Sequence, residues 1–415
     1  MTDKERQTLG EIPLRCGFAD GAPAPNDSRC PVTKYRHEFV PSRLLDEARS
    51  GWFPRGIRHC LCCELCSPRP DASCGACADE FLLFLGPREG NFPRAFGGAL
   101  DAVVELQITK QGAGHRLSET KSRVPVPVLT NENRQNRLGW ITPDLQVADG
   151  SKPGDVALFV GCAPYYDVLL EERQCAIVGA HGSAPTIGFR ATDEARAAVE
   201  LLNSVGVRPV VLGDEVCCGG DRLHAGDREG FTALGERNRD LLRERGVRTV
   251  VTGCDDCRYT LGNRYPRHIE GWNFEVVRLA DFLVQRGGRL AFMPTRESVA
   301  VQPPDPFSDP AGIGSVRRIL ARIPSLDVRE IEPGHPSTFG GWGQLNSVSK
   351  RLETDLLKAA QATGATKVLV PGTRMLVRLL EGRRPGSWEE TSIAIKAFYG
   401  FLVERHTVAA EFTGA

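Results

Sequence analysis

From Asp155 onward, short apolar runs alternate with amphipathic stretches along the chain. Short apolar runs are typical of buried strands, and amphipathic stretches are typical of the helices that cover them. Their alternation predicts βα units built around a mainly parallel sheet. The predicted strands and helices, in chain order, are Val156–Val160, Asp193–Ser204, Pro209–Leu212, Phe231–Arg245 and Thr249–Thr252. Glycines follow both helices, at Gly206 and Gly246, and favour termination there.

A weaker copy of this pattern follows. The predicted elements, again in chain order, are Val299–Gln302, Gly314–Ile323, Val328–Ile331, Lys350–Ala362 and Lys367–Val370. An amphipathic helix over residues 388–405 is expected to close the chain. Such internal repetition predicts two similar α/β units, over residues 151–292 and 293–415.

The first 150 residues differ from the rest in composition and in hydrophobic pattern. Residues 1–85 are rich in Cys, Pro and Gly and contain one predicted helix, Pro41–Ser50. Residues 86–150 are polar, with Gly-rich and Asn-rich pieces, and are expected to form a linker with some local structure. We therefore expect a small N-terminal domain, a linker and then the two α/β units.

Charge and apolar content exclude some classes of protein. The chain has 52 basic and 52 acidic residues, so we expect no nucleic acid as its main partner. Its longest apolar runs fall far short of the ~20 residues that span a bilayer. The stretch Met1–Gln7 is charged and lacks the apolar core of a secretory signal. We expect a cytoplasmic protein that reaches a membrane only through a partner subunit.

The fourteen cysteines are unevenly distributed. Eight lie between Cys16 and Cys77, six lie between Cys162 and Cys257, and the last 158 residues contain none. Secreted disulfide scaffolds are usually much shorter than this chain, and clustered cysteines in a reducing compartment more often bind metal. The distribution therefore predicts two separate metal-binding sets.

The central set follows the predicted strands. Cys162 comes after the first strand, the pair Cys217 and Cys218 after the second, and Cys254 and Cys257 after the third. The carboxyl ends of parallel strands converge on the ligand crevice of an open sheet, so five thiolates are expected to meet there. Thiolates favour iron–sulfur clusters, zinc or Cu(I). Five are one more than a cubane cluster or a tetrahedral zinc ion needs.

The run Val160–Pro266 resembles the CCG domain found in the B and D subunits of heterodisulfide reductases. The matching pieces are Phe-Val-Gly-Cys at 159–162, Cys-Cys-Gly-Gly at 217–220, the helix carrying Asn238, and Gly-Cys-Asp-Asp-Cys at 253–257. Upstream, Asn136–Trp140 is similar to the approach to this domain in fused family members. The resemblance implies a noncubane [4Fe–4S] cluster on Cys162, Cys217, Cys218, Cys254 and Cys257. A structural zinc site on four of the five is the alternative.

The chain departs from this family at two places. The 54 residues between Cys162 and Cys217 exceed the family's spacing, which predicts an inserted loop from Cys175 to Arg190 with Cys175 as a spare thiol. In the second unit the family's ligands are replaced, for example by Gln302–Asp305 and by Val370–Thr373. We therefore expect a degenerate second CCG-type repeat without a metal site. His335 lies near the lost ligands and is expected to have no metal-binding role.

The N-terminal set contains a ferredoxin-type motif. Cys60, Cys63 and Cys66 have the spacing that points three thiolates at one iron–sulfur core, and Cys30, followed by Pro31, suits the remote fourth position. This predicts a [4Fe–4S] cubane. Three further cysteines, Cys16, Cys74 and Cys77, with Cys62 as an extra, are candidates for a second cluster. Zinc binding or free thiols remain alternatives for these residues.

The N-terminal segment also resembles the helical ferredoxin domain of the heterodisulfide reductase C subunit, because Pro41–Trp52 is similar to its linking helix and turn. The combined resemblance implies an iron–sulfur electron-transfer subunit of a heterodisulfide reductase-like redox complex. Electrons would pass between a flavoprotein or ferredoxin and the noncubane cluster, with other subunits as partners. With one such cluster, direct heterodisulfide cleavage by this chain alone is not expected. The alternatives are a thiol- or disulfide-binding reductase at that cluster and a zinc-binding structural subunit.

Overall fold

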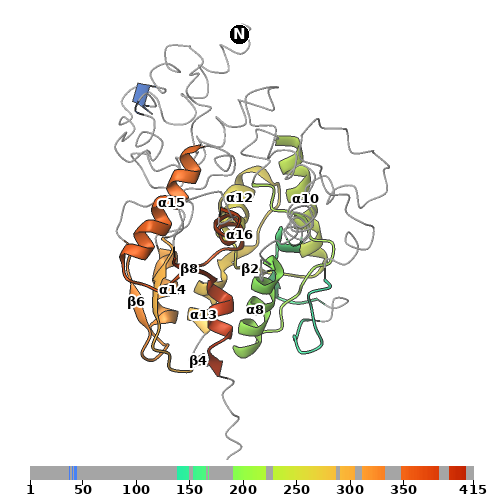
Figure 1. The fold of residues 1–415 in the computed structure, drawn as a ribbon. Coiled ribbons are helices and arrows are strands. Elements are labelled where there is room, and N and C mark those ends of the chain that lie inside the picture. The colour runs from blue at the N-terminus through green and yellow to red at the C-terminus, as the bar shows by residue number, and fades with distance from the viewer. Residues whose placement is uncertain are drawn as a thin grey trace, which may run out of the picture.

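The computed structural model describes most of the chain from residue 138 onward (Figure 1). The described ranges are 138–148, 153–164, 190–220, 228–286, 290–303, 311–331, 347–382 and 392–407, with a few isolated residues before and between them. The expected ferredoxin-like domain and almost all of the expected linker lie outside these ranges. So do the cysteines predicted as ligands in that domain, which are Cys16, Cys30, Cys60, Cys63, Cys66, Cys74 and Cys77.

The first unit has a parallel sheet in the order β1-β2-β3, formed by Val156–Leu158, Thr249–Thr252 and Glu275–Arg278. Val210 pairs in parallel with Ala157 on the free side of β1. The strand predicted at Pro209–Leu212 is thus reduced to a single bridge. The Val210 N–H donates to the Val156 carbonyl oxygen and the Val210 carbonyl oxygen accepts from the Leu158 N–H, both at 2.9 Å, whereas the Pro209 carbonyl oxygen faces away from β1 and accepts from the Ala148 N–H.

Two helices of this unit lie where the sequence predicts them, α8 (Ala191–Ser204) and α10 (Arg228–Glu244). The sequence pattern does not predict the other four, which are α11 (Asp255–Tyr259), the π-helix η4 (Thr260–Arg264), α12 (Tyr265–His268) and α13 (Leu279–Arg286). In α8 the buried positions Ala195, Ala198 and Leu202 recur every three or four residues, as an amphipathic helix requires. Gly206 and Gly246 adopt positive φ after α8 and α10, so the predicted stop signals are confirmed.

The second unit has a four-stranded parallel sheet in the order β6-β5-β7-β8. Its strands are β5 (Ser298–Val301), β6 (Asp327–Arg329), β7 (Lys367–Val370) and β8 (Ala394–Ala397), and its helices are α14 (Ala311–Leu320), α15 (Ser347–Ala362), α16 (Thr373–Gly382) and α17 (Phe398–Val403). The single closing helix predicted over 388–405 is wrong. Pairing with β7 makes 394–397 an edge strand, and only six residues of helix follow it.

The two sheets share one strand order. In each, the strand that comes second in the chain lies at one edge, next to the first, and the third and fourth strands lie in turn on the other side of the first. In the first unit the second position is taken by the bridge at Val210. The units also exchange contacts: α13 packs on α14, α17 packs on α8, and β4 (Ala291–Phe292) pairs antiparallel with β9 (His406–Thr407). One apolar core therefore joins the two units, with α8 and α13 near the middle of the molecule in Figure 1.

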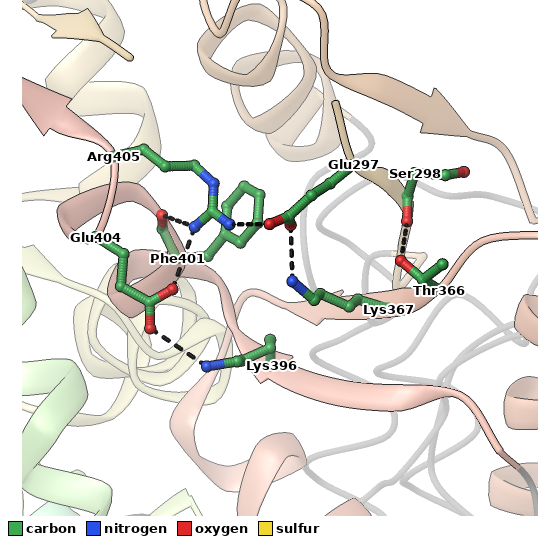
Figure 2. Close-up of polar contacts among 8 residues, drawn as sticks. All are labelled: Glu297, Ser298, Thr366, Lys367, Lys396, Phe401, Glu404 and Arg405. Atoms are coloured by element: carbon green, nitrogen blue, oxygen red, sulfur yellow. Dashed lines mark hydrogen bonds and ion pairs between the residues drawn. The ribbon is translucent and has the colours of Figure 1, made fainter. Parts of the chain in front are cut away.

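A network of charged residues fastens the C-terminal segment to the second sheet (Figure 2). Glu297 accepts hydrogen bonds from Arg405 and Lys367, both at 2.7 Å. The Arg405 guanidinium also lies 3.6 Å from the centre of the Phe401 ring and donates to the Phe401 carbonyl oxygen. These contacts hold the end of α17 against the amino-terminal edge of β5 and β7. Across the described ranges, every helix is too short or too polar to span a bilayer.

Candidate metal centre

The five central cysteines lie at the carboxyl edge of the first sheet. Cys162 follows β1, Cys217 and Cys218 follow the bridge at Val210, and Cys254 and Cys257 flank the start of α11 after β2. This is the arrangement expected from parallel strands, whose carboxyl ends share one edge. The loops that leave this edge therefore carry thiols toward a common region.

The five side chains form a continuous chain of thiol contacts. The Sγ atoms of Cys162 and Cys217 are 3.0 Å apart. Hydrogen bonds then link Cys217 to Cys218, Cys218 to Cys257, and Cys257 to Cys254. None of the five forms a disulfide; the three in the middle are buried and the two at the ends, Cys162 and Cys254, are half-buried.

Negative charge in this chain is most stable on Cys218. Hydrogen bonds from the Cys217 and Cys257 thiols, together with the Gly220 N–H and the Thr260 hydroxyl, hold the pKa of Cys218 well below its usual range. The pKa values of Cys217 and Cys257 are raised, because each thiol donates to a neighbouring sulfur and because burial penalises their thiolates. The site therefore favours a thiolate at its centre.

Buried polar side chains fix the backbone that carries these thiols. Glu215 accepts hydrogen bonds from the N–H groups of Val160 at 3.1 Å and Gly161 at 2.6 Å. Gly161 has φ of +63°, and a Cβ there would lie 3.0 Å from the Cys257 Sγ. A glycine is thus required on both conformational and steric grounds, and the loop is drawn tightly toward the sulfurs.

Asn238 of α10 fastens the segment with the adjacent cysteines. Its side-chain oxygen accepts from the Val216 N–H at 3.0 Å, and its amide nitrogen donates to the carbonyl oxygens of Val216 and Cys217 at 3.2 Å. The Tyr265 hydroxyl donates to the Cys218 carbonyl oxygen at 2.9 Å. Burial raises the pKa of Tyr265 well above its ordinary value, so it stays a donor. Asn238 and Tyr265 thus replace the backbone partners that this irregular segment lacks.

An ion pair and the second unit support the last two cysteines. Arg278, at the end of β3, donates to Asp255 at 2.6 Å, and Asp255 directly follows Cys254. Burial raises the pKa of Asp255, while the charge of Arg278 opposes that shift. The Tyr399 ring of α17 lies 3.0 Å from where a Cβ of Gly253 would stand. A residue of the second unit therefore packs directly beneath the thiol site.

The donor set fits a cluster of several metal atoms. In the part of the chain that the structure describes, no three His, Cys, Asp or Glu side chains surround one point as ligands of a single ion do. Five thiols are one more than a tetrahedral zinc ion can bind, and the additional ligand suits a group with several iron atoms. An all-sulfur set is also the ligand type that iron–sulfur clusters prefer.

The second unit has no thiols at the matching edge of its sheet. Its carboxyl edge carries Gln302 and Pro303 after β5 and Pro371 and Gly372 after β7, and the sequence contains no cysteine beyond Cys257. The Gln302 side chain is buried, and its oxygen has no partner among the described residues. His335 and the inserted loop with Cys175 lie outside the described residues.

Sequence patterns do not identify several of the residues that support the thiol site. Glu215, Asp255 and Thr260 are polar residues, and polar residues are usually exposed. Their partners come from distant segments: Arg278 lies at the end of a strand that the apolar pattern does not predict, and Tyr399 lies in the other unit. The one available signal is position, since Asp255 and Thr260 flank Cys257 closely in sequence.

Comparison with protein families gives one match. Residues 156–262 match the family described as CCG, cysteine-rich domain. This segment contains β1, β2 and all five cysteines of the thiol chain. It accounts for about a quarter of the chain, and it coincides with the part that carries the candidate metal centre.

Three curated proteins are similar to this chain over stretches longer than the family match. The B subunit of the fumarate reductase (CoM/CoB) of Methanothermobacter marburgensis is 25% identical over 316 residues, which are 74% of this chain and 55% of that protein. The D subunit of the dihydromethanophenazine:CoB–CoM heterodisulfide reductase of Methanosarcina mazei is 28% identical over 37% of this chain and 32% of its own length. An uncharacterized iron–sulfur protein of Methanocaldococcus jannaschii is 29% identical over 37% and 31%. The chain thus spans about half of the first relative and a third of the others.

Proposed function

We propose, from the premise that residues 156–262 are a cysteine-rich domain of the CCG family, that this chain is an iron–sulfur subunit of a heterodisulfide reductase-like redox complex. The observation that carries the proposal is the continuous chain of five thiols at the carboxyl edge of the first sheet. The names of the relatives, which include reductase subunits and an iron–sulfur protein, support the same class of function.

Two sets of residues would hold the clusters. A noncubane [4Fe–4S] cluster would be held by Cys162, Cys217, Cys218, Cys254 and Cys257. A [4Fe–4S] cubane would be held by Cys30, Cys60, Cys63 and Cys66, and Cys16, Cys74 and Cys77 are candidates for a second cubane or for zinc. When bound, such clusters supply one-electron storage and transfer. A flavoprotein or a ferredoxin is the proposed electron donor or acceptor, within a complex of other subunits.

The chain's own residues would give this centre two properties. Phe159, Phe231 and Leu261 pack around the buried cysteines and exclude water, which strengthens every electrostatic interaction at the sulfurs. Cys162 and Cys254, at the ends of the thiol chain, remain half-buried and are where electrons or a ligand would reach the site. An apolar site with two accessible ends suits an electron relay.

A thiol- or disulfide-binding reductase is the second candidate. The partial exposure of Cys162 favours it, because a sulfur substrate needs access to the centre. This candidate predicts that an added thiol or disulfide changes the spectrum of the purified protein. A relay without a sulfur substrate predicts an unchanged spectrum.

The test is metal and sulfide analysis of anaerobically purified full-length protein, with electron paramagnetic resonance (EPR). We expect about eight irons with matching sulfide, roughly four for each of two clusters. Cys218→Ser should abolish the signal of the central cluster. Cys175→Ser is the matched control, since Cys175 belongs to neither predicted set, and it should leave iron content unchanged. Zinc without sulfide would contradict the proposal and favour a structural subunit.

A further inference from the structure

Thr260 occupies an unusual place beside the thiol chain. It is the first residue of the π-helix η4, which begins three residues after Cys257, and its side chain is buried with 1% exposure. Single π-turns inside helices widen the backbone and are frequent at functional sites. The wider turn directs Thr260 inward, between the α11 segment and the loop that carries Cys218 and Gly220.

The Thr260 hydroxyl hydrogen-bonds the Cys218 sulfur. Gly220 leaves room for this contact, since a Cβ at Gly220 would stand 2.7 Å from the Thr260 Oγ1 and 3.7 Å from the Cys218 Sγ. The Gly220 N–H donates to the same sulfur. Two donors from different segments, one side chain and one backbone group, therefore meet at the central sulfur of the chain.

These two donors differ from the thiol donors to Cys218. A cysteine binds metal as a thiolate, so Cys217 and Cys257 would lose the protons that they donate here. The Thr260 hydroxyl and the Gly220 N–H keep theirs. A hydrogen bond to a ligating sulfur stabilises negative charge there, and the negative charge is greater in the reduced state.

We infer that Thr260 is a positioning residue for the cluster, whose hydroxyl orients the Cys218 Sγ and raises the reduction potential of the centre. The inference rests on the proposed function, in which the five cysteines hold an iron–sulfur cluster. The added electron increases the negative charge on the sulfur, and the Thr260 O–H is already directed at that atom. No proton needs to leave Thr260 for this effect.

The experiment compares hydroxyl-bearing and hydroxyl-free variants of the full chain. Thr260→Val keeps the shape of the side chain without the donor, and Thr260→Ser keeps the donor. The matched control is Thr249→Val, at the other end of β2, where the lost hydrogen bond joins an exposed Glu275. After iron and sulfide analysis, the midpoint potential is measured by EPR-monitored redox titration. We expect a lower potential in Thr260→Val and wild-type potentials in Thr260→Ser and Thr249→Val.

A second measurement reads the hydrogen bond directly. Hyperfine spectroscopy after exchange into D2O should show a deuteron coupling from the Gly220 N–D in every variant, and a second one from the residue 260 hydroxyl in wild type and Thr260→Ser that is missing in Thr260→Val and Thr260→Ala. Loss of iron in both hydroxyl-free variants, with full loading of Thr260→Ser, also supports the positioning role. Fully loaded Thr260→Val with the wild-type potential and both couplings overturns the inference. Wild-type protein without iron and sulfide overturns the proposed function instead.

Discussion

Glu194 of the first unit accepts a hydrogen bond from the backbone N–H of Gly400 in the second unit, at 2.9 Å. The carboxyl group lies on α8 and meets the first turn of α17, whose Tyr399 packs beneath Gly253 in the thiol site. The two units are therefore joined by a buried carboxyl group as well as by apolar packing. Its second oxygen has no partner among the described residues.

The first prediction concerns this carboxyl group. Burial raises the pKa of Glu194 to about 7, although the N–H groups of Gly400 and Tyr399 lower it. Between the ordinary carboxyl pKa and pH 7, the folded chain keeps a proton that the unfolded chain has lost. Folding stability from this group therefore falls as pH rises through that window, by up to ~3 kcal/mol.

Glu194→Gln should remove that pH dependence while keeping an acceptor for Gly400. The difference in free energy of unfolding, variant minus wild type, should therefore increase from pH 5 to pH 8. Urea denaturation of both proteins at the two pH values measures it. Glu244→Gln, at the exposed end of α10, is the control and should change neither value. Parallel pH profiles of Glu194→Gln and wild type would show that Glu194 does not titrate in this way.

The second prediction separates backbone strain from crowding at the sulfurs. Gly161 and Gly364 both have positive φ, at +63° and +77°. A Cβ at Gly161 would stand 3.0 Å from the Cys257 Sγ, whereas a Cβ at Gly364 meets nothing within 4 Å. Gly161→Ala and Gly364→Ala should each cost about 1–2 kcal/mol of stability from strain alone.

Only Gly161→Ala should also lower the iron and sulfide content per chain, because only there does the added methyl group displace a candidate ligand. Thermal unfolding and metal analysis of both variants check this. Equal iron in the two purified proteins would mean that Cys257 tolerates the displacement. A loss of iron in Gly364→Ala would trace the effect to general destabilisation.

Strands in the interior of a sheet can be predicted from the sequence more accurately than strands at its edge. Thr249–Thr252 and Lys367–Val370 are predicted to the residue, because each is an apolar run with a neighbour on both sides. The edge strands Glu275–Arg278 and 394–397 are not predicted, since they pair on one side only and their apolar signal is weak. Their place is set by pairing with β2 and β7, which no local pattern contains.

The candidate metal centre shows the same contrast between what a local sequence pattern contains and what distant partners decide. The meeting of the five cysteines follows from strand order, so the sequence is enough to predict it. The residues that hold them, such as Glu215 and Arg278, act through partners far away in the chain. A sequence pattern identifies atoms that bind metal, but it does not identify the partners that set their positions.

The third prediction compares two asparagines that each make three hydrogen bonds with backbone groups. Asn238 is buried and bonds Val216 and Cys217, whereas Asn203 is half-buried and bonds Gln146 and Val207 away from the sulfurs. Asn238→Ala leaves three buried backbone groups without partners and should cost at least about 3 kcal/mol. Asn203→Ala should cost about 1 kcal/mol, because water replaces its contacts.

Asn238→Ala should also reduce iron content, since the Cys217 carbonyl oxygen loses its donor and the segment is released. Urea denaturation and metal analysis of both variants are the measurements. Similar losses of stability in the two would contradict the importance of burial. Full iron in Asn238→Ala would show that Tyr265 alone is enough to hold the segment.

The last prediction concerns the charged network of Figure 2. A hydrogen bond from Lys367, with further help from Arg405, holds the pKa of Glu297 below its ordinary value. A carboxyl group of this kind stabilises the fold above the unfolded pKa, and the contribution is lost as pH falls through the folded pKa. Its side chain is 29% exposed, so solvent screening reduces the effect to about 1 kcal/mol.

Glu297→Gln should therefore destabilise the protein by about 1 kcal/mol at pH 7, and the difference from wild type should shrink as the pH falls from 7 to about 3. The control is Glu330→Gln, whose partner Arg317 makes a shorter but more exposed pair and which should change stability by less than about 0.5 kcal/mol. Urea denaturation of both variants and wild type at the two pH values is the measurement. A pH-independent loss in Glu297→Gln would show that shape, and not charge, makes the residue important.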